Sequence, residues 1–196
     1  MKVSPKHLFA PTVVGLVFLL GGILAMPAAA QTSAIWKGLR GGGHVVLLRH
    51  AIAPGTGDPQ DFVVDDCQTQ RNLSDDGRDQ ARRIGARFRD NGIDRAAVFS
   101  SQWCRCLETA ALLDLGAVQP LPILNSFFRR SERRKPQTEA LRQWIAESDL
   151  AVPTVLVTHY VNIAALTGVS PASGELVVVR REGDGSLSVV GTIETD

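Results

Sequence analysis

Two histidines and two arginines carry the most chemistry in this chain, and each follows an apolar run. Arg49 and His50 end the stretch Val45–Leu48, His159 follows Thr154–Val157, and Arg105 lies a few residues beyond Ala96–Phe99. A neutral imidazole is a capable nucleophile at pH 7, and guanidinium groups bind phosphate through paired hydrogen bonds. Together these residue types could hold a phosphoryl group and transfer it without a metal.

The apolar runs must place these side chains, and they are typical of buried strands. Patterns of helical period follow several of them: a helix capped by Ser74 that ends at Asn91-Gly92, a helix over residues 103–115 and a helix over residues 138–148. We expect strands at residues 45–48, 96–99, 121–124 and 154–157, and a hairpin from residues 176–180 and 186–193. This alternation predicts a three-layer α/β/α sandwich with a mainly parallel sheet and an antiparallel C-terminal hairpin.

Ligands of open α/β sheets bind beyond the carboxyl ends of the strands. If the first and fourth strands are neighbours, their spacing of about 4.8 Å brings His50 and His159 toward one point. Arg49 and Arg105 would then complete a small cationic pocket there.

The first 30 residues have the order of a secretory leader. Lys2, Lys6 and His7 precede an apolar run to Met26, and three alanines precede Gln31. We expect cleavage after Ala30 and export, to the periplasm, of one domain over residues 31–196. An uncleaved membrane anchor is the alternative, because the apolar run approaches the roughly 20 residues that span a bilayer.

The net charge of the chain limits the classes of partner that it is expected to bind. The leader holds two of the 21 lysines and arginines, so 19 remain against 20 acidic residues. Near-neutral charge argues against a general nucleic-acid binder and, after leader cleavage, against membrane binding. We expect a phosphorylated small molecule as the partner and no cofactor.

The three cysteines fit an oxidising compartment better than a metal site. Cys67, Cys104 and Cys106 lack the paired spacing and histidines of a zinc site. Cys104 and Cys106 are too close for an easy bridge, so a disulfide from Cys67 to either of them is plausible.

Four segments, in this order, resemble motifs of the histidine phosphatase superfamily, which has the phosphoglycerate-mutase-like fold. They are LLRHA at 47–51, NLSDDGRDQA at 72–81, VFSSQWCRCLETA at 98–110 and VLVTHYVNI at 155–163. The resemblance implies that His50 becomes phosphohistidine and that Arg49, Arg105 and His159 surround the phosphate. Arg71 and Asn72 would line the approach, or else serve only as turn residues.

The proton donor that the resemblance implies is missing. Asn125 lies near the position where one branch of the superfamily carries a Glu, and Tyr160 stands where the other carries an acid. Glu132 is the nearest downstream carboxylate, and Asp58 and Asp61 could also reach the pocket, although solvation is the expected state of all three. We therefore expect a metal-independent phosphatase that acts through a phosphohistidine intermediate, or else a catalytically weak phospho-ligand-binding protein of the same fold.

One basic segment remains outside this assignment. Residues 127–135, FFRRSERRK, combine aromatic and cationic side chains. A solvated loop is the simpler interpretation. The functional one is a rim that attracts an acidic, phosphorylated substrate.

Overall fold

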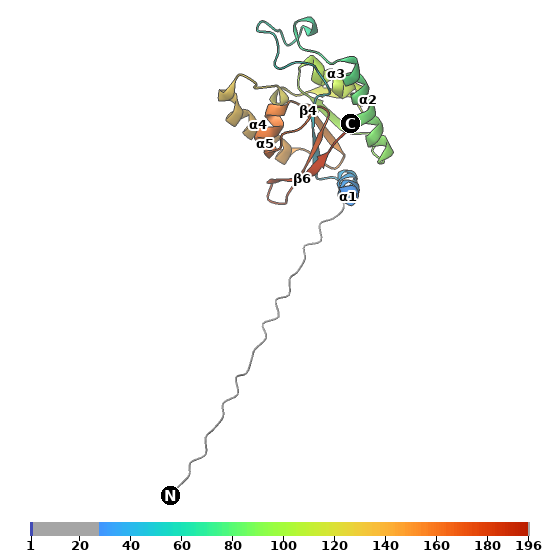
Figure 1. Cartoon of the computed structure of the whole chain (residues 1–196), viewed down its shortest axis with the longest axis vertical. Coiled ribbons are helices and arrows are strands. Elements are labelled where there is room, and N and C mark those ends of the chain that lie inside the picture. The colour runs from blue at the N-terminus through green and yellow to red at the C-terminus, as the bar shows by residue number, and fades with distance from the viewer. Residues whose placement is uncertain (2–27, 196) are drawn as a thin grey trace.

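The structure, a computed structural model, describes Met1 and residues 28–195 (Figure 1). A six-stranded sheet runs through it in the order β3-β2-β4-β1-β5-β6. The strands are β1 (His44–Arg49), β2 (Ala97–Ser100), β3 (Val118–Pro120), β4 (Thr154–Thr158), β5 (Leu176–Arg181) and β6 (Leu187–Ile193). The pairs β1–β4, β2–β4 and β2–β3 are parallel, whereas β5 is antiparallel to both β1 and β6.

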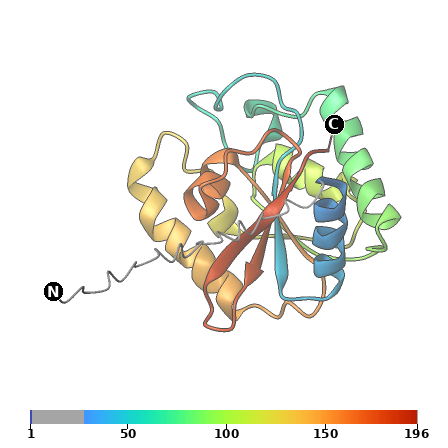
Figure 2. The ribbon, with the colours of Figure 1, turned by 60° about the horizontal axis from the view of Figure 1, so that its bottom comes forward.

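Helices cover both faces of the sheet (Figure 2). The helices α1 (Ala28–Arg40), α2 (Asp75–Asp90) and α3 (Cys104–Leu112) lie on one face, and α4 (Arg134–Glu147) and α5 (Tyr160–Thr167) on the other. The central strand β1 serves both layers because successive side chains point to opposite faces. Val46 and Leu48 pack in the core under α1 to α3, and Val45 and Leu47 in the core under α4 and α5.

The predicted fold class is confirmed, including the antiparallel hairpin at the C-terminal end. The third strand was predicted too far toward the C-terminus, at residues 121–124. It lies at Val118–Pro120, and Pro122–Leu124 forms a 3-10 helix, η2. Pro122 has no N–H for a strand ladder but suits the start of a helical turn.

One helix begins earlier than the sequence predicts, and another was not predicted. The predicted helix at 138–148 begins earlier, at Arg134, with Pro136 in its first turn, where a missing N–H costs little. Helix α1 was not predicted at all, although its apolar Ile35, Trp36 and Leu39 are almost completely buried against the sheet.

The leader predicted at residues 1–30 lies almost wholly outside the described residues. Cleavage after Ala30 would remove the first three residues of α1. The core contacts of this helix come from Ile35, Trp36 and Leu39, beyond the cleavage point. Among the described residues, no helix has the length and apolarity needed to cross a bilayer.

Two glycines of α2 allow close packing, one against the loop after β1 and the other against the end of α3. A Cβ on Gly77 would lie 2.0 Å from the carbonyl oxygen of Ile52, and one on Gly85 would lie 2.1 Å from that of Leu113. In addition, Gln80 accepts a hydrogen bond from the N–H of Ile52 at 3.0 Å. Helix α2 thus fixes the position of the backbone immediately beyond His50.

Candidate active site

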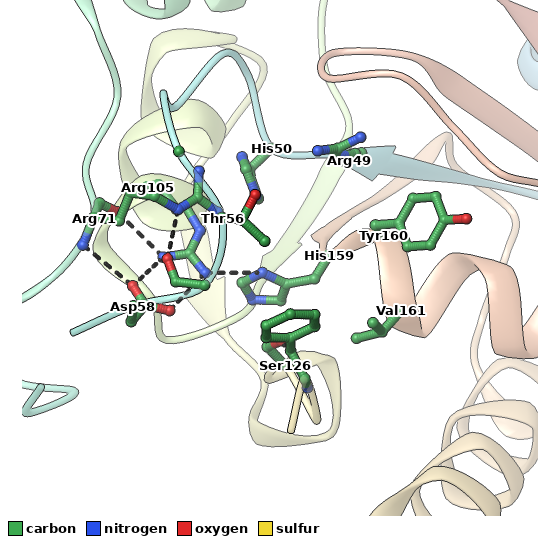
Figure 3. A pocket seen from close by; sticks show the side chains of 13 residues that line it. Arg49, His50, Thr56, Asp58, Arg71, Arg105, Ser126, His159, Tyr160 and Val161 are labelled. Carbon is green, nitrogen blue, oxygen red and sulfur yellow. Dashed lines mark hydrogen bonds and ion pairs between the residues drawn. The ribbon is translucent and has the colours of Figure 1, made fainter. Parts of the chain in front are cut away.

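A cavity of about 160 Å³ opens at the carboxyl ends of β1 and β4 (Figure 3). The register pairs Arg49 with Thr158, and the N–H of His50 donates to the carbonyl of Thr158 at 3.0 Å. His50 and His159, one residue beyond each strand, therefore lie side by side with ring centroids 5.5 Å apart. The polar residues lining the cavity include Arg49, His50, Asp58, Arg71, Arg105, Ser126, His159 and Tyr160.

His50 is held as a neutral ring with one nitrogen free. Its Nδ1 lies 2.8 Å from the carbonyl oxygen of Ala51, which can only accept a hydrogen bond. Nδ1 therefore carries the proton, and Nε2 keeps its lone pair. Burial, with the positive charge of Arg105 as the next cause, lowers the pKa of His50 to about 3. The ring is thus in its nucleophilic form at neutral pH.

His159 is fixed in the opposite tautomer. Its Nδ1 lies 3.5 Å from Nη2 of Arg105, which can only donate, so the proton belongs on Nε2. Nε2 is 2.8 Å from Oγ of Ser101, and that hydroxyl donates onward to Asn125 Oδ1 at 3.2 Å. Burial, followed by the charges of His50 and Arg105, lowers the pKa of His159 well below its ordinary value. His159 is therefore a neutral ring, poorly suited to supply a proton.

Three guanidinium groups surround the histidines. Arg49 donates through Nη1 to the carbonyl of Pro171 at 2.9 Å, and Arg71 donates to the carbonyls of Gly57 and Ala53. Burial is the main cause that lowers the pKa of both Arg49 and Arg71. Nevertheless, arginine stays protonated in proteins, so both remain cations.

Two buried donors among the described residues of this site have no partner. They are Nε of Arg49 and Nε of Arg105. A buried N–H without an acceptor is costly, and these two belong to cations that line one cavity. An anion bound there would give them acceptors.

Asp58 forms a buried ion pair with Arg105. Nη1 and Nη2 of Arg105 lie 2.6 and 3.0 Å from the two carboxylate oxygens of Asp58, and the two side chains are only 3% and 8% exposed. Trp103 Nε1 donates to the same carboxylate at 3.0 Å. Burial alone would raise the pKa of Asp58, but the hydrogen bond and charge of Arg105 hold it below its ordinary value. The solvated state expected for Asp58 is wrong, because Arg105 draws the loop after β1 inward.

The other predicted residues divide into two groups. Arg71 lines the cavity as expected. Asn72 does not: its amide donates to the carbonyl of Cys67 at 2.6 Å, so its predicted place in substrate binding is corrected to a loop contact. Glu132 and Asp61 are exposed and lie outside the cavity lining. Asp58 is therefore the lining carboxylate within the described part of the chain.

A disulfide joins the loop after β1 to the start of α3. Cys67 is bonded to Cys104, next to Arg105 in sequence, which confirms that Cys67 forms a bridge. Cys106 stays free and buried, 3.5 Å from Nε2 of His159, and burial raises the pKa of its thiol to about 12. It is therefore an unreactive thiol.

Sequence reasoning missed the contact of Ser101, whereas it named Asp58 as able to reach the pocket but did not predict its ion pair with Arg105. Ser101 directly follows β2, as His159 follows the neighbouring β4, and this shared position at the sheet edge is a signal that could have found it. No comparable signal marks Asp58, which lies in an irregular loop.

The arrangement is suited to an anion with two charges. Arg49, Arg71 and Arg105 supply three positive charges, Asp58 offsets one, and the two histidines are neutral. The lining therefore carries about two positive charges, the magnitude of a phosphate dianion. Among the described residues, no group of three or more His, Cys, Asp or Glu side chains could hold a metal ion.

Comparisons with known proteins point to one family. Residues 45–127 match the sequence profile of the histidine phosphatase superfamily (branch 1). No sequence relative was found among the curated proteins. The matched segment contains Arg49, His50, Arg71 and Arg105 but ends before His159.

Solved structures share the fold at low sequence identity. The protein histidine phosphatase SixA complexed with tungstate is 18% identical, with a TM-score of 0.55 over 78% of this chain and 97% of that one. A mycobacterial glucosyl-3-phosphoglycerate phosphatase is 16% identical, with a TM-score of 0.55 over 76% and 97%. YhfR of Bacillus stearothermophilus is 17% identical, with a TM-score of 0.57 over 76% and 95%.

Proposed function

We propose that this chain is a phosphatase of the histidine phosphatase superfamily and hydrolyses phosphoryl substrates through a phosphohistidine at His50, without a metal; the profile match over residues 45–127 and the shared fold support this. The observation that carries this proposal is the fixed tautomer of His50. The carbonyl of Ala51 holds the proton on Nδ1, so the lone pair of Nε2 is available beside the three arginines.

In the first step, Nε2 of His50 attacks phosphorus and the bond from phosphorus to the leaving oxygen breaks, with its electron pair going to that oxygen. Arg49, Arg71 and Arg105 stabilise the negative charge on the equatorial oxygens. In the second step, water attacks phosphorus and loses a proton to the released leaving group or to solvent, while the P–N bond breaks and its electron pair returns to Nε2. The cationic charge comes from the arginines, which is why the proposal includes no metal.

The leaving oxygen finds no ready proton in this site. Asp58 is ionised and paired with Arg105, and His159 is neutral with its proton directed at Ser101. An efficient general acid must hold its proton near the working pH. We therefore propose that preferred substrates have leaving groups that need little protonation, such as acyl phosphates, phosphohistidine or pyrophosphate-type linkages.

We also propose that the protein is exported into the periplasm after cleavage of residues 1–30. The support is the charged, apolar and small-residue order of that segment together with the disulfide between Cys67 and Cys104. Disulfides persist in oxidising compartments and are rare in the cytosol. The mass of the protein recovered from a periplasmic fraction tests this, and a mass that includes the first 30 residues would refute cleavage.

Turnover of 4-nitrophenyl phosphate in the presence of a chelator tests the chemistry. We expect His50→Ala to abolish turnover and the acid-labile phosphoenzyme together. His44→Ala is the matched control, because His44 lies at the opposite end of the same strand and outside the cavity lining. Equal loss in both variants, or full activity in His50→Ala, would exclude His50 as the nucleophile.

A phospho-ligand-binding protein is the second candidate, because the ionised state of Asp58 leaves the lining without a protonated carboxyl group. It predicts that inorganic phosphate raises the unfolding temperature of the wild type although no aryl phosphate is turned over. Measurable turnover that depends on His50 would exclude it.

A further inference from the structure

A second and larger cavity adjoins the first. Its volume is about 430 Å³, against about 160 Å³ for the first. Asp58, Ser126 and Phe128 line both cavities, so the two are contiguous at these residues. A ligand whose phosphoryl group occupies the first cavity would therefore direct its remaining atoms into the second.

Charge distinguishes the second cavity from the rest of a nearly neutral chain. Arg129, Arg130 and Arg133 line it. Within the described part of the protein, none of the three forms an ion pair or a side-chain hydrogen bond. Asp58 is the acid in the lining, and Arg105 already neutralises it. The cavity therefore presents three uncompensated guanidinium groups.

Three aromatic side chains, Phe62, Trp103 and Phe128, also line the second cavity. Phe62 and Trp103 lie with ring centroids 5.4 Å apart, and the guanidinium of Arg129 lies 5.7 Å from the centre of the Phe128 ring. Phe128 is 44% exposed and lines the cavity, so its ring is accessible to a ligand there. Such a surface suits the carbon skeleton of an organic group.

The sizes of the two cavities indicate that they bind different parts of one substrate. The first matches the charge of a phosphate dianion and is small, whereas the second falls in the volume range of small-molecule sites, roughly 300–1,000 Å³. Arginine binds carboxylate and phosphate groups with paired hydrogen bonds, and unpaired arginines at a rim also speed the arrival of anions.

We propose that the second cavity, defined by Phe62, Trp103, Phe128, Arg129, Arg130 and Arg133, binds the leaving group of the substrate and selects one that carries its own carboxylate or phosphate. The substrate class is thus a small phosphorylated molecule with a second anionic group. This inference rests on the proposed function, because it takes the first cavity as the place of phosphoryl transfer.

A pair of matched substrates tests the inference. 3-Carboxyphenyl phosphate and its carboxamide differ in the charge of the leaving group but hardly in its shape. We expect the wild type to prefer the carboxylate at least tenfold in kcat/KM. In the double variant Arg130→Gln/Arg133→Gln, we expect this preference to fall to within twofold of unity, since the local charge is removed while side-chain length is kept.

The control is Arg134→Gln/Lys135→Gln. It removes the same charge from the adjoining residues, which do not line the second cavity. We expect it to keep at least half of the wild-type preference. Absence of preference in the wild type, or equal loss in the two double variants, would overturn the inference, since the latter result means a general charge effect.

Binding separates this test from that of the proposed function. Calorimetric titration of both substrates into His50→Ala gives the preference as a ratio of Kd values, with no turnover required. If the wild type hydrolyses neither substrate but the ratio still depends on Arg130 and Arg133, the proposed function fails and the anionic subsite stands. A ratio near unity overturns the subsite even when the carboxamide is hydrolysed.

Discussion

Removal of the disulfide between Cys67 and Cys104 should destabilise the protein and weaken anion binding together. The two residues are 37 positions apart in sequence, and their sulfur atoms join the loop after β1 to the first residue of α3. That loop carries Asp58 and Arg71, and Arg105 directly follows Cys104. The crosslink thus holds together two segments that supply three of the charged groups of the site.

The magnitude follows from the length of the closed loop. For a separation of 37 residues, the loss of loop-closure entropy in the unfolded chain corresponds to about 4 kcal/mol at 25 °C. For a domain of this size each kcal/mol shifts Tm by roughly 2–4 °C, so we expect a decrease of about 8–16 °C. The N–H of Cys104 also donates to Gln70 Oε1 at 3.0 Å, and this contact should keep the loop partly docked without the disulfide.

The assay is thermal unfolding followed by circular dichroism for Cys67→Ser, Cys104→Ser and the double variant. All three should unfold at similar temperatures, because loss of either sulfur removes the whole crosslink. Reductant should lower the Tm of the wild type toward that of the double variant and leave the double variant unchanged. A decrease below 2 °C, or additive losses in the single variants, would refute the entropic reasoning.

Three further predictions concern the site and its supports. Asp58→Asn leaves the buried Arg105 without its counterion, so we expect a loss of about 3 kcal/mol in urea unfolding; inorganic phosphate should raise its Tm more than that of the wild type, and an equal rise would count against competition for Arg105. The pKa of His50 is about 3 in the folded state against an ordinary 6.5, so between these pH values the unfolded state binds one more proton than the folded state. The free energy of unfolding should therefore be highest above pH 6.5 and fall by about 2 kcal/mol by pH 5. His50→Gln should make this pH dependence shallower, and an unchanged slope would contradict the assignment. Gly77→Ala should destabilise α2 strongly, since the added Cβ would meet the Ile52 carbonyl oxygen at 2.0 Å, and an unchanged midpoint in urea would contradict that packing.

The sequence allowed the sheet and its functional edge to be predicted because both depend on local signals. An apolar run followed by a polar residue marks where a buried strand ends, and β1 and β4 both have this form. The assumption that they are neighbours placed His50 beside His159, as the structure has them. To predict that the two histidines are close, it was enough to assume that β1 and β4 are adjacent, because the carboxyl ends of parallel strands lie at the same edge of the sheet.

Elements were mispredicted where a local signal had two interpretations. The apolar residues around Pro122 suit a strand, but the ring of proline directs them into a 3-10 turn. Helix α1 was missed because its first residues, Ala28 to Ala30, were assigned to a leader. The spacing of Ile35, Trp36 and Leu39 on one helical face was a signal that could have revealed it.

The role of Asp58 could not be predicted because it arises from long-range electrostatics in a loop without regular structure. Arg105 is fixed by α3 and is 3% exposed, and a buried cation without a counterion is strongly unfavourable. In the absence of a ligand, the carboxylate of Asp58 meets that need. A phosphate that binds to Arg105 must therefore share or displace an anion that the protein itself supplies. The affinity of the site for phosphate then depends on how much more favourable the contact of Arg105 with phosphate is than its contact with the Asp58 carboxylate. The loop that brings Asp58 inward sets the free energy of the second contact.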